Sequence, residues 1–175
     1  LLRENRLPMA YVPDEPVRAL RELCRHRHRL ARQLALARRH LRWVGLKNNL
    51  PGPTTLSSDR AQKWLLSQDA KLNAAHRLAS RQFVDQITAL DRQLADVEQV
   101  LAATVAAHAD LAPTLALFQS VPGIGFITAL TILCECGDIT RFDTMDELSS
   151  YAGLCPRVTQ SGESAHHGQI GRAHV

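Results

Sequence analysis

The chain has 175 residues, of which 45% are hydrophobic and 22% are charged, and its formal net charge is +4. This composition is typical of a globular protein and excludes a disordered chain. No window approaches the roughly 18 consecutive apolar residues of a membrane span. We therefore expect a cytoplasmic protein without a membrane partner.

A basic helix is expected from Asp14 to about Gly45, after a helix end and a short extended piece at 1–13. Asp14, Glu15 and Pro16 are typical of a helix start. Ten Lys or Arg and three acids lie between Asp14 and Lys47, a net charge of +7. So large an excess of positive charge predicts a nucleic-acid-binding face. The alternative interpretation is a solvated helix surface, which would have the same run of charges. The expected contacts are Arg18, Arg21, Arg25, Arg29 and Arg32.

A second long helix is expected over about 71–108, after a loop and a short helix near Trp64. Its apolar seam is spaced four, three, four, three, four, which is a heptad pattern. The seam residues are Phe83, Ile87, Leu90, Leu94, Val97 and Leu101. We therefore predict a mostly α fold in which 14–110 forms a long antiparallel coiled-coil hairpin and a homo-oligomer. A plain helical-bundle core would have the same spacing.

The four cysteines predict no metal site, because they contain no C-x-x-C pair. They are Cys24, Cys134, Cys136 and Cys155. Reduced structural thiols are the expectation in a cytoplasm.

A Pro-Gly-Ile-Gly turn stands between two apolar helical runs in a small helical domain expected over 111–168. Pro122 fixes φ, and Gly123 and Gly125 permit positive φ and a close approach of another backbone. The helix that starts near Phe126 directs unpaired N–H groups over the turn. These three turn residues therefore predict a helix-hairpin-helix-like phosphate contact. An ordinary helix–helix turn would use the same residue types.

Farther along the chain, Gly137 is expected to end that second helix. Thr144 and Glu147 have the spacing of a capping box for a helix that reaches about Ala152. The stretch from Arg157 to Gly168 is polar.

Several motifs in this region share their order and spacing with one family. They are Val121-Pro-Gly-Ile-Gly, Gly137-Asp-Ile-x-Arg-Phe, Leu148-x-x-Tyr-Ala-Gly-Leu-x-Pro and Gln160-Ser-Gly. Together they resemble the C-terminal domain of the Piv-type insertion-sequence transposases, and Leu7 to Arg27 is similar to that family's passage from nuclease domain into coiled coil. The resemblance covers 1–168. Residues 169–175 are expected to lie outside the fold, because Ile170 to Val175 reads as a translated sequencing adapter.

The resemblance implies a fragment of a bacterial recombinase that cuts and joins DNA under the direction of a structured guide RNA. In this family a RuvC-like domain with an Asp-Glu-Asp-Asp tetrad binds Mg²⁺, and a serine of the C-terminal domain attacks DNA. Ser161 matches that serine, and Arg157 and Gly162 are expected to contact nucleic acid. Residues 1–13 would be the end of the nuclease domain. The acids would precede Leu1, so no cofactor is expected in this chain, which should be inactive alone.

Two alternatives stay open. One is a non-enzymatic coiled-coil and helix-hairpin-helix module that only binds nucleic acid, and the other is a purely structural dimerisation protein. His166 and His167 could supply a general base near Ser161, or they could be solvent-exposed.

Overall fold

The structure is a computed structural model that describes residues 12–50, 57–108, 110–154, 158–161 and 164–167. The chain divides into two compact units, Leu1–Glu135 and Cys136–Val175. Helices dominate the described residues, so the predicted mostly helical fold is confirmed. None of the described helices is both long and apolar enough to cross a membrane.

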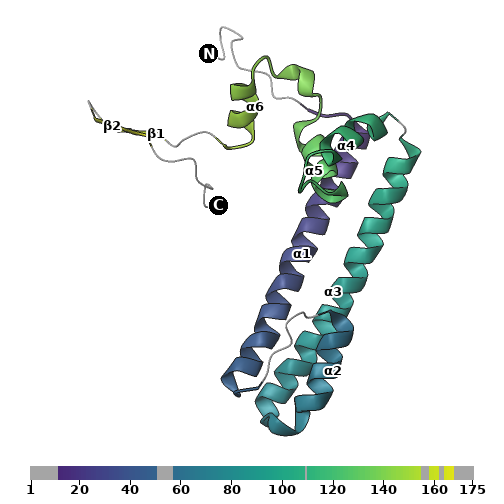
Figure 1. The fold of residues 1–175 in the computed structure, drawn as a ribbon, viewed down its shortest axis with the longest axis vertical. Helices are drawn as coiled ribbons and strands as arrows, with labels where there is room; N and C mark the ends of the chain where they lie inside the picture. Colours follow the sequence, from purple (N-terminus) through teal and green to yellow (C-terminus); the bar gives the residue numbers. More distant parts are fainter. Residues whose placement is uncertain (1–11, 51–56, 109, 155–157, 162–163, 168–175) are drawn as a thin grey trace, which may run out of the picture. The chain divides into compact units, whose positions relative to one another are not determined.

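Two long helices, α1 (Glu15–Lys47) and α3 (Ala74–Ala107), form the body of the first unit (Figure 1). α1 follows Asp14 and has a proline in its first turn, where a missing N–H costs nothing. It ends at Asn48, whose N–H donates to the carbonyl of Gly45 at 3.1 Å. Asn73 caps α3, because its side chain accepts a hydrogen bond from the His76 N–H at 2.8 Å.

α1 and α3 pack antiparallel. Arg27 of α1 contacts Glu98 of α3, whereas Arg38, later in α1, contacts Asp91, earlier in α3. In the predicted seam of α3, Ile87 and Leu101 are fully buried. The other four seam residues, Phe83, Leu90, Leu94 and Val97, are partly buried against the core. The predicted helical hairpin is therefore confirmed, and its assembly into an oligomeric coiled coil stays a prediction.

Each end of the hairpin has its own hydrophobic cluster. At one end, α2 (Ser58–Gln68) packs on α3 and is followed by the short 3₁₀ helix η1 (Asp69–Lys71). This cluster contains Leu34, Ala37, Leu41, Ala61, Trp64, Val84 and Ile87. At the other end lie α4 (Leu111–Gln119) and α5 (Phe126–Cys136). That cluster contains Leu20, Cys24, Leu101, Leu115, Ala129, Leu130 and Cys134.

Truncation of Ile87 tests the first cluster. Ile87 is fully buried, so Ile87→Ala is expected to lower the free energy of unfolding by about 2–5 kcal/mol. The loss has two causes, since apolar surface is no longer buried and a cavity is left behind. Urea denaturation followed by circular dichroism measures this change. Leu78→Ala is the matched control, because Leu78 lies on the same helix but is 60% exposed, and its expected effect is below about 0.5 kcal/mol. Equal losses for the two variants would contradict this packing.

The second unit holds the 3₁₀ helix η2 (Ile139–Arg141) and the helix α6 (Met145–Tyr151). Thr144 caps α6 by accepting from the Glu147 N–H at 3.3 Å, and the Glu147 carboxylate accepts from the Asp143 N–H at 2.9 Å. The predicted cap is thus confirmed, although the Glu147 carboxylate accepts from the N–H of Asp143 and not from that of Thr144. Gly137 follows α5 with φ +64°, which is the left-handed conformation predicted for a residue that ends a helix.

The stretch predicted only to be polar forms a β-hairpin. Strand β1 (Val158–Ser161) pairs antiparallel with β2 (Ser164–His167). The register sets Ser161 opposite Ser164 and Val158 opposite His167. The main-chain ladder therefore places Ser161 at the turn end of this hairpin.

Candidate nucleic-acid interface

The exposed side of α1 carries a row of arginines. Four of them are exposed, namely Arg18, Arg29, Arg32 and Arg39. They lie eleven, three and seven residues apart, and these intervals keep side chains on one side of a helix. Leu20, Leu34 and Leu41 are buried on the opposite side. Within the described part of the chain, none of the four guanidinium groups has a hydrogen-bond or ion-pair partner. We call these four residues the basic row.

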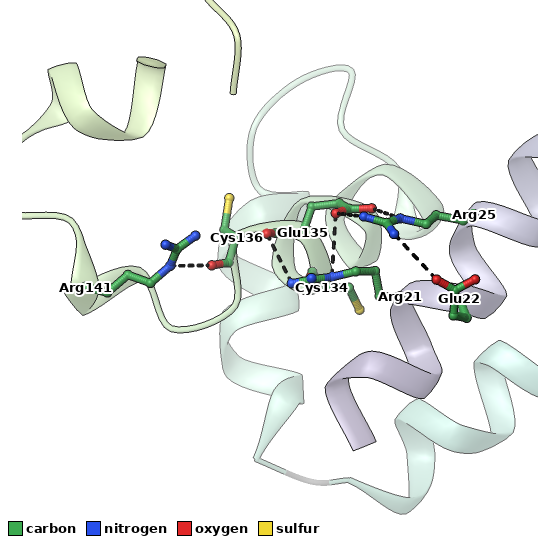
Figure 2. Close-up of polar contacts among 7 residues, drawn as sticks. All are labelled: Arg21, Glu22, Arg25, Cys134, Glu135, Cys136 and Arg141. Carbon is green, nitrogen blue, oxygen red and sulfur yellow. Dashed lines mark hydrogen bonds and ion pairs between the residues drawn. The ribbon is translucent and has the colours of Figure 1, made fainter. Parts of the chain in front are cut away.

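Two other arginines predicted to contact nucleic acid are engaged inside the first unit (Figure 2). Arg21 donates to the carbonyls of Cys134 at 2.9 Å and Glu135 at 3.4 Å, and its side chain is only 14% exposed. Arg25 makes two hydrogen bonds with the Glu135 carboxylate, at 2.7 and 2.8 Å, and one with Glu22 at 3.5 Å. These contacts hold the C-terminal end of α5 on α1, where cations match the orphan carbonyls and the helix dipole.

Glu135 also acts on the charge of Arg25. Its hydrogen bond raises the pKa of the Arg25 guanidinium above the usual value, so Arg25 stays charged and bound to a carboxylate. We therefore leave Arg21 and Arg25 out of the basic row.

Cross-helix ion pairs engage two further arginines of α1. Arg27 donates to Glu98 at 2.7 and 2.9 Å, and Arg38 donates to Asp91 at 2.8 Å. The second Asp91 oxygen accepts from the Ser58 N–H at 3.1 Å, which ties α2 to the same site. Sequence reasoning found few acids near these arginines along α1, and the matching acids come from other helices.

The glycine turn lies between α4 and α5. Gly123 has φ +91°, and the Ile124 N–H closes the turn on the Val121 carbonyl at 3.1 Å. An added Cβ at Gly123 or Gly125 would meet no atom within 4 Å. The turn is therefore open on its outer side, and Pro122 is exposed there. Phosphate binding at these residues stays a prediction.

The remaining predicted site residues lie at or beyond the β-hairpin. Ser161 is the last residue of β1, and His166 and His167 belong to β2, opposite Thr159 and Val158. Arg157 and Gly162 lie outside the described residues. The hairpin thus gives Ser161 a defined main-chain position, and its role as a nucleophile stays a prediction.

Two of the four cysteines, which the sequence did not pair, meet in the second cluster. The thiols of Cys24 and Cys134, on α1 and α5, share a hydrogen bond. This bond lowers the pKa of Cys24 to about 7, and with burial it raises the pKa of Cys134. Because the two residues are far apart in sequence, no spacing rule could have paired them.

The Mg²⁺ implied by the resemblance has no ligand set in the described part of this chain. There, no group of three or more His, Cys, Asp or Glu side chains is arranged to hold a metal ion.

Comparison with known proteins links the chain to mobile DNA elements. Residues 115–175 match the model of the Transposase IS116/IS110/IS902 family. A putative transposase, y4qE, of Sinorhizobium fredii is 28% identical over 166 residues, which cover 94% of this chain and 38% of the relative.

Two further relatives match shorter segments. The transposase for insertion sequence element IS1111A of Coxiella burnetii is 38% identical over 72 residues, covering 41% of this chain and 19% of the relative. The pilin gene-inverting protein of Moraxella bovis is 38% identical over 86 residues, which cover 49% of this chain and 24% of the relative.

The chain spans well under half the length of these relatives. No solved structure matches it. The matched residues include the C-terminal half of α4, the glycine turn, α5, the capped helix α6 and the β-hairpin. Residues 115–175 are therefore similar to the Transposase IS116/IS110/IS902 family.

Proposed function

We propose that this chain is the nucleic-acid-binding and strand-transfer part of a DNA transposase or recombinase. The observation that carries the proposal is the basic row, four exposed arginines on the side of α1 opposite its buried leucines. Exposed arginines without acidic partners are suited to phosphate oxygens. The names of the transposase and pilin gene-inverting relatives support DNA as the substrate.

The length of the basic row fits a nucleic-acid backbone. Arg18 and Arg39 are 21 residues apart, which is about 32 Å along a helix that rises 1.5 Å per residue. One helical turn of duplex DNA is about 34 Å long. The row can therefore follow one duplex over roughly one turn, and it would position the substrate without reading its sequence, as phosphate contacts do.

Strand transfer is assigned to Ser161 as the attacking hydroxyl. The proposal rests on the match of Gln160-Ser161-Gly162 to the family motif and on the family match over 115–175. A serine hydroxyl is a weak nucleophile and needs a base or a metal to activate it. The activating group is proposed to come from the nuclease domain of a longer protein, which also holds Mg²⁺.

A guide RNA and a second copy of the chain complete the proposal. The basic row offers the same phosphate chemistry to RNA as to DNA, and the hairpin offers long helical faces for oligomer formation. Both partners follow from the resemblance and from the heptad pattern of α3.

Salt-dependent binding of the 175-residue chain tests the proposal. Fluorescence anisotropy with a labelled blunt DNA duplex should give a log–log salt slope of about −3 to −4, because each neutralised phosphate contributes about −0.9. A slope near zero, or no binding at low salt, would contradict the proposed function and favour a structural dimerisation protein. An RNA hairpin of matched length, run in parallel, tests the guide-RNA part.

A further inference from the structure

The far end of the hairpin contains a cavity walled by aromatic rings. It has a volume of about 310 Å³ and lies between α1 and α3. Four rings line it, those of His40 and Trp43 from α1 and of His76 and Phe83 from α3, together with the side chain of Lys47. A concave, largely apolar site with one cationic group is typical of small-ligand recognition.

Trp43 is exposed at this cavity. Its side chain is 55% exposed, whereas the other tryptophan, Trp64, is 7% exposed and belongs to the first cluster. A large indole left in water forgoes the burial that normally stabilises it. An occupant with a flat aromatic face would recover that burial.

The other rings are held in place from both helices. The His40 and Phe83 rings are 5.2 Å apart with an interplanar angle of 48°. The Nδ1 atom of His76 lies 3.0 Å from the Asn48 side-chain amide and 3.2 Å from that of Asn73. The walls of the cavity are therefore positioned before any ligand arrives.

The cavity continues the basic row along α1. Trp43 and Lys47 follow Arg39 at intervals of four residues, which keeps them on about the same side of the helix. A polyanion that follows the row reaches the cavity, and Lys47 can meet its next phosphate. The cavity volume suits a single flat group and excludes a folded element.

We propose that this cavity receives one unpaired nucleobase, stacked on Trp43, from the nucleic acid whose backbone follows the basic row. The inference rests on the proposed function and deepens it, because it specifies a substrate with a duplex next to an unpaired nucleotide. Every base has an aromatic face, so stacking on Trp43 would tolerate any sequence.

A comparison of three DNA probes tests this inference with the 175-residue chain. All three contain the same duplex of about two helical turns. The first probe has blunt ends, the second has a single-stranded overhang of adenosines, and the third has an abasic overhang of equal charge. Fluorescence anisotropy should show that the adenosine overhang binds roughly 5- to 100-fold more tightly than the abasic one. Trp43→Ala should abolish this gain and leave the affinity for the blunt duplex unchanged.

Two variants control for packing. Trp43→Phe keeps an aromatic face and should retain most of the gain. Leu46→Ala removes a 67% exposed side chain of the same helix end that does not line the cavity, and it should retain all of the gain.

Three outcomes would overturn the inference. In the first, the chain binds the blunt duplex but binds the adenosine and abasic overhangs with equal affinity. This outcome overturns the inference and leaves the proposed function intact. Another is a self-association seen by analytical ultracentrifugation without DNA and lost in Trp43→Ala, which would assign the cavity to a second copy of the chain. The last is failure to bind the blunt duplex, which would overturn the proposed function as well.

Discussion

Replacement of Arg18, Arg29, Arg32 and Arg39 by glutamine should weaken the binding of duplex DNA by roughly 10³-fold at about 0.1 M salt. The physical reason is the loss of counterion release from four phosphates, each of which contributes about 0.9 to the salt slope. The variant should therefore also have a log–log slope near zero. Fluorescence anisotropy over a series of salt concentrations measures both quantities.

A charge-matched control separates the basic row from a general effect of net charge. The double variant Arg29→Gln/Arg32→Gln removes two charges from the row, and Lys63→Gln/Arg92→Gln removes two exposed charges from α2 and α3. Only the first double variant should lose affinity by more than about 10-fold. If both lose the same affinity, the contact is not made by the row. Arg21 is unsuitable for this test, because its removal would break the hydrogen bonds that join α1 to the end of α5.

Ser161→Ala should abolish strand exchange in a longer protein that contains this chain. Removal of a nucleophilic hydroxyl lowers the rate of such reactions by roughly 10³- to 10⁶-fold, because no covalent intermediate can form. The measurement is excision of a marked element from a plasmid in cells, followed by quantitative amplification of the rejoined junction. Binding of duplex DNA by the same variant should stay unchanged.

Ser164→Ala is the matched control for Ser161, since the main-chain register pairs the two residues in the β-hairpin. It removes a hydroxyl from the same hairpin and should leave the excised fraction within about 10-fold of the wild-type value. An active Ser161→Ala variant would instead assign the reaction to another group. The nucleic-acid-binding module without a catalytic role would then be the better description of this chain.

The helical hairpin was predictable from sequence because its signal is local and periodic. The α3 seam keeps heptad spacing from Phe83 to Leu101, and that period is visible in any window of the helix. The cap at Thr144 and the left-handed glycine at Gly137 were predictable for the same reason, since each depends on residues within one turn.

The partners of the α1 arginines were not predictable from sequence. Glu135 lies more than a hundred residues from Arg21 and Arg25, and it reaches them only because α5 packs against α1. Charge counted along the chain therefore overstated the number of arginines available to a ligand. Trp43 and Phe83 likewise line one cavity from different helices of the hairpin, so no sequence window contained the aromatic cavity.

The β-hairpin was missed for a different reason. Its strands are four residues each and rich in Ser, Thr, Gln and His, so they lack the alternating apolar pattern by which a strand is identified. Pairing of the main chain, which any residue can supply, defines this element.

The cross-helix pairs of Arg27 with Glu98 and of Arg38 with Asp91 bear on the alignment of the hairpin. A repetitive apolar seam can slide by one heptad and still bring leucine against leucine. Such a slip would displace the helices by about 10 Å and leave both arginines facing the wrong residues. Partly exposed ion pairs add little to stability, so their main effect is to select one alignment among several of similar energy. The two ion pairs thereby select the alignment in which His40 and Trp43 of α1 line one cavity with His76 and Phe83 of α3.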